Sequence, residues 1–262
     1  THRAASHQRA ALFRFRDRPE KNTEMIVSKE NEKLKLVRKL GQKKHRRKLG
    51  MFVTEGEDLA LAGLDAGHEP VALLVHPDVE MPGEKVEPEL LDGVATLASG
   101  TRVIGIWAEI WAEPELLTAD KCLFLDGVSD PGNIGTIIRT ADALVGGTVV
   151  LGPGSADPFS GIAVRSSMGS IFTQPVARAE IGQTPTPRVA TVPAGGEEPG
   201  PVEGPATICL GSEREGLSAD VLKECGITWT IPQRPGGAES LNVAAAAAIA
   251  CERISSTPSR VA

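Results

Sequence analysis

Residues 121–139 read KCLFLDGVSDPGNIGTIIR, and this stretch decides how the C-terminal half of the chain folds. Its apolar beginning (121–128) predicts a buried strand, SDPGN predicts a turn, and 134–146 carries apolar residues at helical spacing. Further apolar segments predict strands at 148–152, 187–194, 206–213 and 227–232. Helical patterns at 161–172 and from 239 onward complete the alternation, which predicts an α/β domain with a mainly parallel sheet.

The preceding residues predict a second, smaller α/β domain. Residues 29–49 form a helical pattern with Leu34, Val37 and Leu40 on one side. Segments that predict a strand, a helix, a strand and further alternation follow, at 50–56, 58–66, 71–77 and up to 108. We therefore divide the chain into an extension (1–24) expected to be disordered, a small α/β domain (25–107), a linker (108–120) and the larger α/β domain (121–262).

The charge of the chain is distributed unevenly. The net charge is −6, yet residues 1–50 contain 16 Lys and Arg against 5 Asp and Glu, while the rest contains 12 against 29. Such asymmetry is typical of a basic polyanion-binding segment attached to an acidic body. The basic residues of 33–48 share a segment with Leu34, Leu36, Val37, Leu40 and Leu49, which favours a structured basic face over a tail. We expect this face to bind RNA through Lys43, Lys44, Arg46 and Arg47.

Several classes of protein are disfavoured. No apolar run approaches the roughly 20 residues of a membrane helix, and the first thirty residues lack an apolar signal core, so we expect a cytoplasmic protein without a membrane partner. The four cysteines contain no CxxC pair, which predicts neither a zinc site nor a redox dithiol. We expect them to be buried apolar residues in a reducing compartment. They are Cys122, Cys209, Cys225 and Cys251.

Three loops are richer in Gly, Asn, Ser and Pro than ordinary turns, which are the alternative interpretation of each. They span 126–135, 211–216 and 231–242, and each follows an apolar strand. Parallel strands place such loops together at the carboxyl edge of one sheet, where open α/β sheets bind ligands. None matches GxxxxGK[ST] or GxGxxG, so a nucleotide-hydrolysing or dinucleotide-binding enzyme is disfavoured.

The loops contain D-P-x-N-x-G-x-x-x-R (130–139), G-x-E-x-x-G (211–216) and I-P followed by S-L-N-V (231–243). In order and spacing they resemble the three motifs of SpoU-type (TrmH-like) RNA 2′-O-ribose methyltransferases of the SPOUT superfamily, over about 121–256. The N-terminal part resembles the family's substrate-binding domain, which is similar to ribosomal protein L30e. The resemblance implies a trefoil knot, S-adenosylmethionine as cofactor and a homodimer.

The resemblance also implies roles for individual residues. Cofactor contacts would come from Thr191, Gly211, Ile231 and Leu241. The catalytic set would be Arg139, Asn133, Glu213, Ser240 and Asn242. All five histidines precede the larger domain, which excludes an ordinary histidine base from it. An arginine pKa above about 12 makes a neutral guanidine costly, so we favour Arg139 as an electrostatic clamp rather than as the base.

Structural alternatives stand beside these roles. Arg139 would pair with Asp142 on a solvated helix face, and Asn133 would cap the helix before Ile134. Glu213 would be a surface acid, and Ser240 and Asn242 would cap the last helix.

The expected function is S-adenosylmethionine-dependent 2′-O-methylation of a ribose in structured RNA, with 23S ribosomal RNA favoured over tRNA. The alternatives are a catalytically silent RNA-binding or ribosome-assembly protein, and methylation of a base atom or a protein. No metal is expected.

Overall fold

The computed structural model describes residues 24–96, 100–113, 117, 120–237 and 240–255. The chain divides into two compact units. The first unit comprises the chain up to Glu109 together with Phe159–Phe172, and the second comprises Ile110–Pro158 and the chain from Thr173 onward. Within the described ranges, no helix is both long and apolar enough to cross a membrane. The expected extension lies almost entirely outside the described residues.

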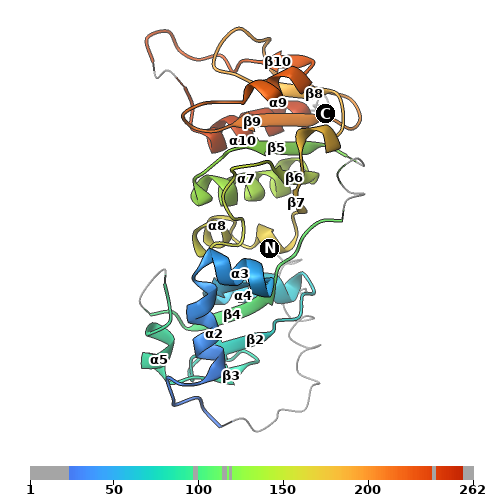
Figure 1. Ribbon diagram of the computed structural model, residues 1–262. Helices are drawn as coiled ribbons and strands as arrows, with labels where there is room; N and C mark the ends of the chain where they lie inside the picture. Colours follow the sequence, from blue (N-terminus) through green and yellow to red (C-terminus); the bar gives the residue numbers. More distant parts are fainter. Residues whose placement is uncertain (1–23, 97–99, 114–116, 118–119, 238–239, 256–262) are drawn as a thin grey trace, which may run out of the picture. The chain divides into compact units, whose positions relative to one another are not determined.

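The first unit is built on a four-stranded mixed sheet with the strand order β1-β4-β2-β3 (Figure 1). Strand β4 pairs antiparallel with β1 and β2, and β3 pairs parallel with β2. The strands are β1 (Met51–Glu55), β2 (Ala72–Val75), β3 (Glu84–Lys85) and β4 (Val103–Ala108). Helices α4 (Glu57–Asp65) and α5 (Pro88–Asp92) also belong to this unit.

The helix predicted over 29–49 is two helices, α2 (Glu32–Leu40) and α3 (Lys43–Leu49). The apolar side of α2 is buried as predicted, through Leu34, Val37 and Leu40. The predicted single helix was wrong because the chain breaks at Gly41 and Gln42, between the two helices.

The segment Phe159–Phe172 belongs to the first unit, where its aromatic side chains pack. In the sequence, however, it lies between two strands of the second unit. The ring of Phe159 lies 5.0 Å from that of Phe52, and Phe172 lies 4.8 Å from Trp107. The helix predicted over 161–172 is shorter: α8 (Gly161–Ser166) is followed by a 3-10 turn, η1 (Ser170–Phe172). Met168 and Gly169 interrupt it with positive φ angles of 49° and 97°.

The second unit is built on a six-stranded sheet in which every pair is parallel, as predicted. The order is β10-β8-β9-β5-β6-β7, which puts β5 in the interior of the sheet (Figure 1). The strands are β5 (Cys122–Asp126), β6 (Thr148–Leu151), β7 (Val176–Arg178), β8 (Arg188–Thr191), β9 (Thr207–Gly211) and β10 (Ile227–Trp229). The other elements are α7 (Pro131–Leu144), η2 (Ile181–Gln183), α9 (Ala219–Glu224) and α10 (Val243–Ser255).

The three Gly- and Asn-rich loops follow the carboxyl ends of β5, β9 and β10. A parallel sheet therefore carries them on one edge, as the sequence predicted. The trefoil knot and the likeness to ribosomal protein L30e stay predictions.

Candidate functional site

The first loop presents Asn133 at the start of α7. Asp130 caps this helix, because its carboxylate accepts hydrogen bonds from the backbone N–H groups of Gly132 (2.6 Å) and Asn133 (3.2 Å). Pro131 occupies the first turn, where the lack of an N–H group has no cost. Asn133 is therefore not the cap of the helix, and its side-chain amide is available for other partners.

The second loop, 211–216, closes on itself. The backbone N–H of Ser212 donates to the carbonyl of Gly216 (3.0 Å), and the reverse bond measures 3.1 Å. A Cβ atom at Gly211 would stand 2.1 Å from the carbonyl carbon of Gly216, so only glycine permits this approach. The tight loop holds Glu213 at its exposed tip.

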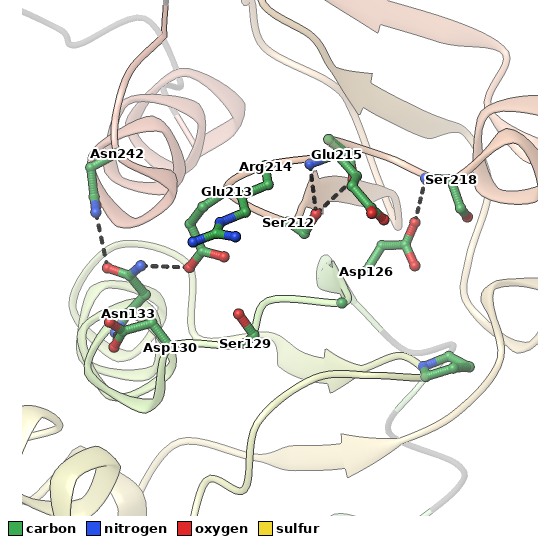
Figure 2. A pocket seen from close by; sticks show the side chains of 13 residues that line it. Asp126, Ser129, Asp130, Asn133, Ser212, Glu213, Arg214, Glu215, Ser218 and Asn242 are labelled. Atoms are coloured by element: carbon green, nitrogen blue, oxygen red, sulfur yellow. Dashed lines mark hydrogen bonds between the residues drawn. The ribbon is translucent and has the colours of Figure 1, made fainter.

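Side-chain hydrogen bonds join all three loops (Figure 2). The Nδ2 atom of Asn133 donates to Oε1 of Glu213 at 2.7 Å, and Nδ2 of Asn242 donates to Oδ1 of Asn133 at 3.1 Å. Asn242 also caps α10, since its Oδ1 accepts from the N–H groups of Ala244 (2.9 Å) and Ala245 (3.3 Å). One amide at Asn133 thus connects the second loop to the third; we call these three side chains the Asn133 bridge.

The Asn133 bridge borders a pocket of about 720 Å³ formed by thirteen residues of the second unit. Four carboxylates line it, together with the cation of Arg214; they belong to Asp126, Asp130, Glu213 and Glu215. Asp126, at the end of β5, accepts a hydrogen bond from the backbone N–H of Ser218 at 2.7 Å. No role was predicted for Asp126, although its position at the end of a predicted strand was a usable signal.

None of the four residues expected to contact a cofactor lines this pocket, but two of them are chain neighbours of residues that do. Gly211 precedes Ser212 and Leu241 precedes Asn242, and both of those neighbours line the pocket. Leu241 is 39% exposed, which is unusual for a large apolar side chain, and Ile231 is half-buried. Thr191 ends β8, and its hydroxyl donates to the carbonyl of Cys209 at 2.7 Å.

Ser240, in the third loop, was predicted to belong to the catalytic set, but it takes no part in the contacts given above. Its side chain is exposed and makes no hydrogen bond to the rest of the described chain. The capping alternative is therefore met by Asn242 and not by Ser240, while Glu239 lies outside the described residues.

Arg139 takes no part in the Asn133 bridge. It lies six residues beyond Asn133 on α7, which separates the two by about 120° around the helix axis and about 9 Å along it. It is exposed and does not line the pocket. Asp142 accepts a hydrogen bond from the hydroxyl of Thr173 at 3.0 Å, and no ion pair joins it to Arg139 among the described residues.

The basic residues expected to bind RNA divide into two kinds. Lys43, Lys44 and Arg47 are exposed on α3. Arg46 is only 6% exposed, and its Nη1 atom donates to the carbonyls of Leu40 (2.8 Å) and Gly41 (3.1 Å). These bonds tie α3 to the end of α2, so the prediction that Arg46 belongs to the exposed RNA-binding face is corrected.

In the part of the chain that the structure describes, no three His, Cys, Asp or Glu side chains group as metal ligands would.

Comparison with known families gives two matches. The model of the SpoU rRNA Methylase family matches residues 120–252, and that of the MRM3-like substrate binding domain matches residues 31–113.

Individual relatives match nearly the whole chain. The 23S rRNA (guanosine(2553)-2′-O)-methyltransferase RlmP of Bacillus subtilis is 33% identical over 86% of this chain and 96% of its own length. An uncharacterised tRNA/rRNA methyltransferase of Synechocystis is 30% identical, over 86% of this chain and 90% of its own length. The crystal structure of the AdoMet-bound rRNA methyltransferase of Sinorhizobium meliloti superposes with a TM-score of 0.76 at 31% identity, covering 87% of this chain and 96% of that one.

Proposed function

The chain belongs to the SpoU rRNA methylase family, and from this we infer that it is an S-adenosylmethionine-dependent 2′-O-methyltransferase of ribosomal RNA. The observation that carries the inference is the Asn133 bridge, in which hydrogen bonds join all three motifs at one pocket. A protein that kept the fold only to bind RNA would not need this arrangement.

The residues around the pocket suit the cofactor. S-adenosylmethionine supplies an activated methyl group on a positively charged sulfur. The carboxylates that line the pocket favour a cation, and the exposed side chain of Leu241 offers an apolar surface to an adenine ring. We propose that Gly211, Ile231, Leu241 and Thr191 hold the cofactor, with the tight turn at Gly211 presenting backbone groups rather than side chains.

We propose that the Asn133 bridge positions the reacting groups. Both ends of the Asn133 amide are used by protein partners, so Asn133 acts by fixing Glu213 and Asn242. The 2′-hydroxyl needs stabilisation of the negative charge that develops on its oxygen. Arg139 would supply it as a forked donor to that oxygen and the neighbouring phosphate, with Ser240 as a further donor and a phosphate oxygen or water accepting the proton.

We propose that the active form is a homodimer. Arg139 lies on the exposed side of α7, away from the pocket of its own subunit. Helix α10 packs against α7 and exposes the apolar side chain of Ile249. A partner subunit that covered α7 and α10 would bury Ile249 and would place Arg139 within reach of its own pocket.

We propose large-subunit (23S) ribosomal RNA as the substrate and the cytoplasm as its location. The proposal is supported by the name of the relative from Bacillus subtilis and by the match to a substrate-binding domain. The test is transfer of labelled methyl groups to purified 23S RNA, 16S RNA and tRNA from cells that lack the gene. Label confined to a 2′-oxygen of 23S RNA is the expected result. Label only in tRNA contradicts the choice of substrate, and no label in any RNA contradicts the activity.

Removing charge from α3 is expected to weaken RNA binding. The triple variant Lys43→Ala, Lys44→Ala, Arg47→Ala should lower affinity and make it less sensitive to salt, with the log–log slope falling by roughly 0.7–0.9 per lost phosphate contact. Cofactor affinity should not change. The control is Lys223→Ala on α9, an exposed lysine of the second unit. Filter binding from 50 to 300 mM salt is the measurement, and an unchanged slope would place the RNA contact elsewhere.

A further inference from the structure

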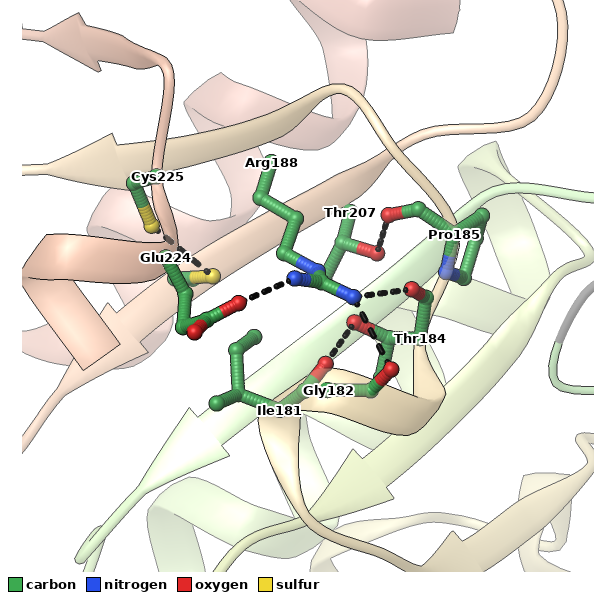
Figure 3. Close-up of polar contacts among 9 residues, drawn as sticks. Ile181, Gly182, Thr184, Pro185, Arg188, Thr207, Glu224 and Cys225 are labelled. Atoms are coloured by element: carbon green, nitrogen blue, oxygen red, sulfur yellow. Dashed lines mark hydrogen bonds and ion pairs between the residues drawn. The ribbon is translucent and has the colours of Figure 1, made fainter. Parts of the chain in front are cut away.

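Two cysteines that are 16 residues apart in the sequence meet in the second unit. Their Sγ atoms lie 3.6 Å apart. Cys209 is buried on β9, and Cys225 is half-buried at the end of α9 (Figure 3). The expectation of no redox dithiol rested on the absence of a CxxC spacing, which says nothing about cysteines brought together by the fold.

A buried cation stands beside the pair. Arg188 is 8% exposed and donates to Glu224 at 2.6 Å and to the carbonyls of Gly182 (3.1 Å) and Thr184 (2.8 Å). Its Nε atom is buried without a hydrogen-bond partner in the described structure. The positive charge of Arg188 acts on both thiols and lowers the pKa of each.

These surroundings give the two thiols different pKa values. The hydrogen bond with Cys209 lowers the pKa of Cys225, and the charge of Arg188 lowers it further, against the opposing effects of burial and Glu224. The same hydrogen bond, together with burial, raises the pKa of Cys209. Cys225 is thus the more accessible and more easily ionised thiol, the properties of a thiol that reacts first with an oxidant.

We propose that Cys209 and Cys225 form a peroxide-oxidised dithiol. The Cys225 thiolate attacks one oxygen of hydrogen peroxide and breaks the O–O bond, giving a sulfenic acid and hydroxide. The Cys209 sulfur then attacks Sγ of Cys225 and displaces the second hydroxide, which forms the disulfide. Two thiol protons and two electrons pass to the peroxide, leaving two waters. The sulfur atoms must close from 3.6 Å to about 2.0 Å, a movement within reach of side-chain rotation.

The disulfide would link β9 to α9 directly behind the second motif loop. Cys209 lies two residues before Gly211, and its carbonyl accepts a hydrogen bond from the hydroxyl of Thr191. Movement of the Cys209 side chain would strain Gly211 and Thr191, two of the residues proposed to hold the cofactor. We expect S-adenosylmethionine affinity to fall severalfold on oxidation and to return with a thiol reductant; this part rests on the proposed function.

The test uses the full chain, reduced and then treated with a small excess of hydrogen peroxide. Free thiols are alkylated after denaturation and counted by mass spectrometry. The protein should fall from four free thiols to two, with residues 209 and 225 cross-linked. The matched variants are Cys225→Ser, which should keep its three thiols, and Cys251→Ser, which should still form the cross-link because Cys251 is buried elsewhere. Equal thiol loss in Cys225→Ser, or a disulfide between other cysteines or between chains, overturns the dithiol.

Calorimetric titration of the reduced and cross-linked protein with S-adenosylmethionine tests the coupling. Weaker binding by the cross-linked form supports it, and equal binding by both forms refutes it. A reduced protein that does not bind the cofactor contradicts the proposed function instead, and leaves the thiol result standing.

Discussion

Asn133→Asp is expected to lower the rate of methyl transfer by at least about 100-fold, or about 2.7 kcal/mol of activation free energy. The substitution removes the Nδ2 donor that reaches Glu213 at 2.7 Å and places a second carboxylate against the first. Two like charges at this distance repel each other, and solvent screens the repulsion only in part because Asn133 is half-buried. The repulsion should open the Asn133 bridge. Single-turnover methylation of a 23S RNA fragment measures the loss.

A second substitution distinguishes a broken hydrogen bond from general damage. Adding Glu213→Gln to Asn133→Asp reverses donor and acceptor, because the glutamine amide can donate to the new carboxylate. We expect the double variant to recover at least about tenfold over Asn133→Asp, non-additive behaviour that only contacting residues show. Lys223→Ala, an exposed lysine of α9 that does not line the pocket, is the control. A double variant no faster than the single one would mean that the Asn133–Glu213 bond does not position the reacting groups.

The sequence predicted which loops gather but not how their side chains connect. Alternating strands and helices require parallel pairing, so the loops after β5, β9 and β10 were expected at one edge. The role of Asn133 could not be settled in the same way, because Asp130 and Asn133 are both good helix caps. Only the geometry shows that Asp130 takes the cap and leaves the Asn133 amide to bind Glu213 and Asn242.

The features that the sequence did not predict depend on contacts between distant residues. Arg46 belongs to a segment whose composition is that of an exposed basic helix. The break at Gly41 nevertheless leaves two carbonyl groups to which Arg46 donates, and these hydrogen bonds hold its side chain in a buried position. Phe159 looks like part of the larger domain until its ring meets Phe52, more than a hundred residues earlier. Local periodicity carries no information about such partners.

Loss of Arg139 is expected to have an effect as large as that of Asn133→Asp. Arg139→Ala and Arg139→Lys should both lower turnover by at least about 100-fold with little change in cofactor affinity, since a lysine cannot contact phosphate and nascent alkoxide together. Rates measured against pH provide the check. A lysine variant of near-normal rate, with a new ionisation near the pKa of lysine, would identify the side chain as a base.

Mixing two inactive variants then tests where Arg139 acts. A mixed dimer has one Arg139→Ala subunit and one Asn133→Asp subunit. If each site combines Asn133 of one subunit with Arg139 of the other, one of the two sites in this dimer is intact and the other carries both substitutions. Equal mixing makes half of the dimers mixed, so activity should rise to about a quarter of wild type. If Arg139 served its own subunit, every site in every dimer would carry a substitution and mixing would restore nothing. The exposed position of Arg139, about 120° around α7 from Asn133 and outside the pocket lining, favours the first result. Activity no higher than the mean of the two variants, in a mixture shown by differently tagged subunits to have exchanged, would refute the shared site.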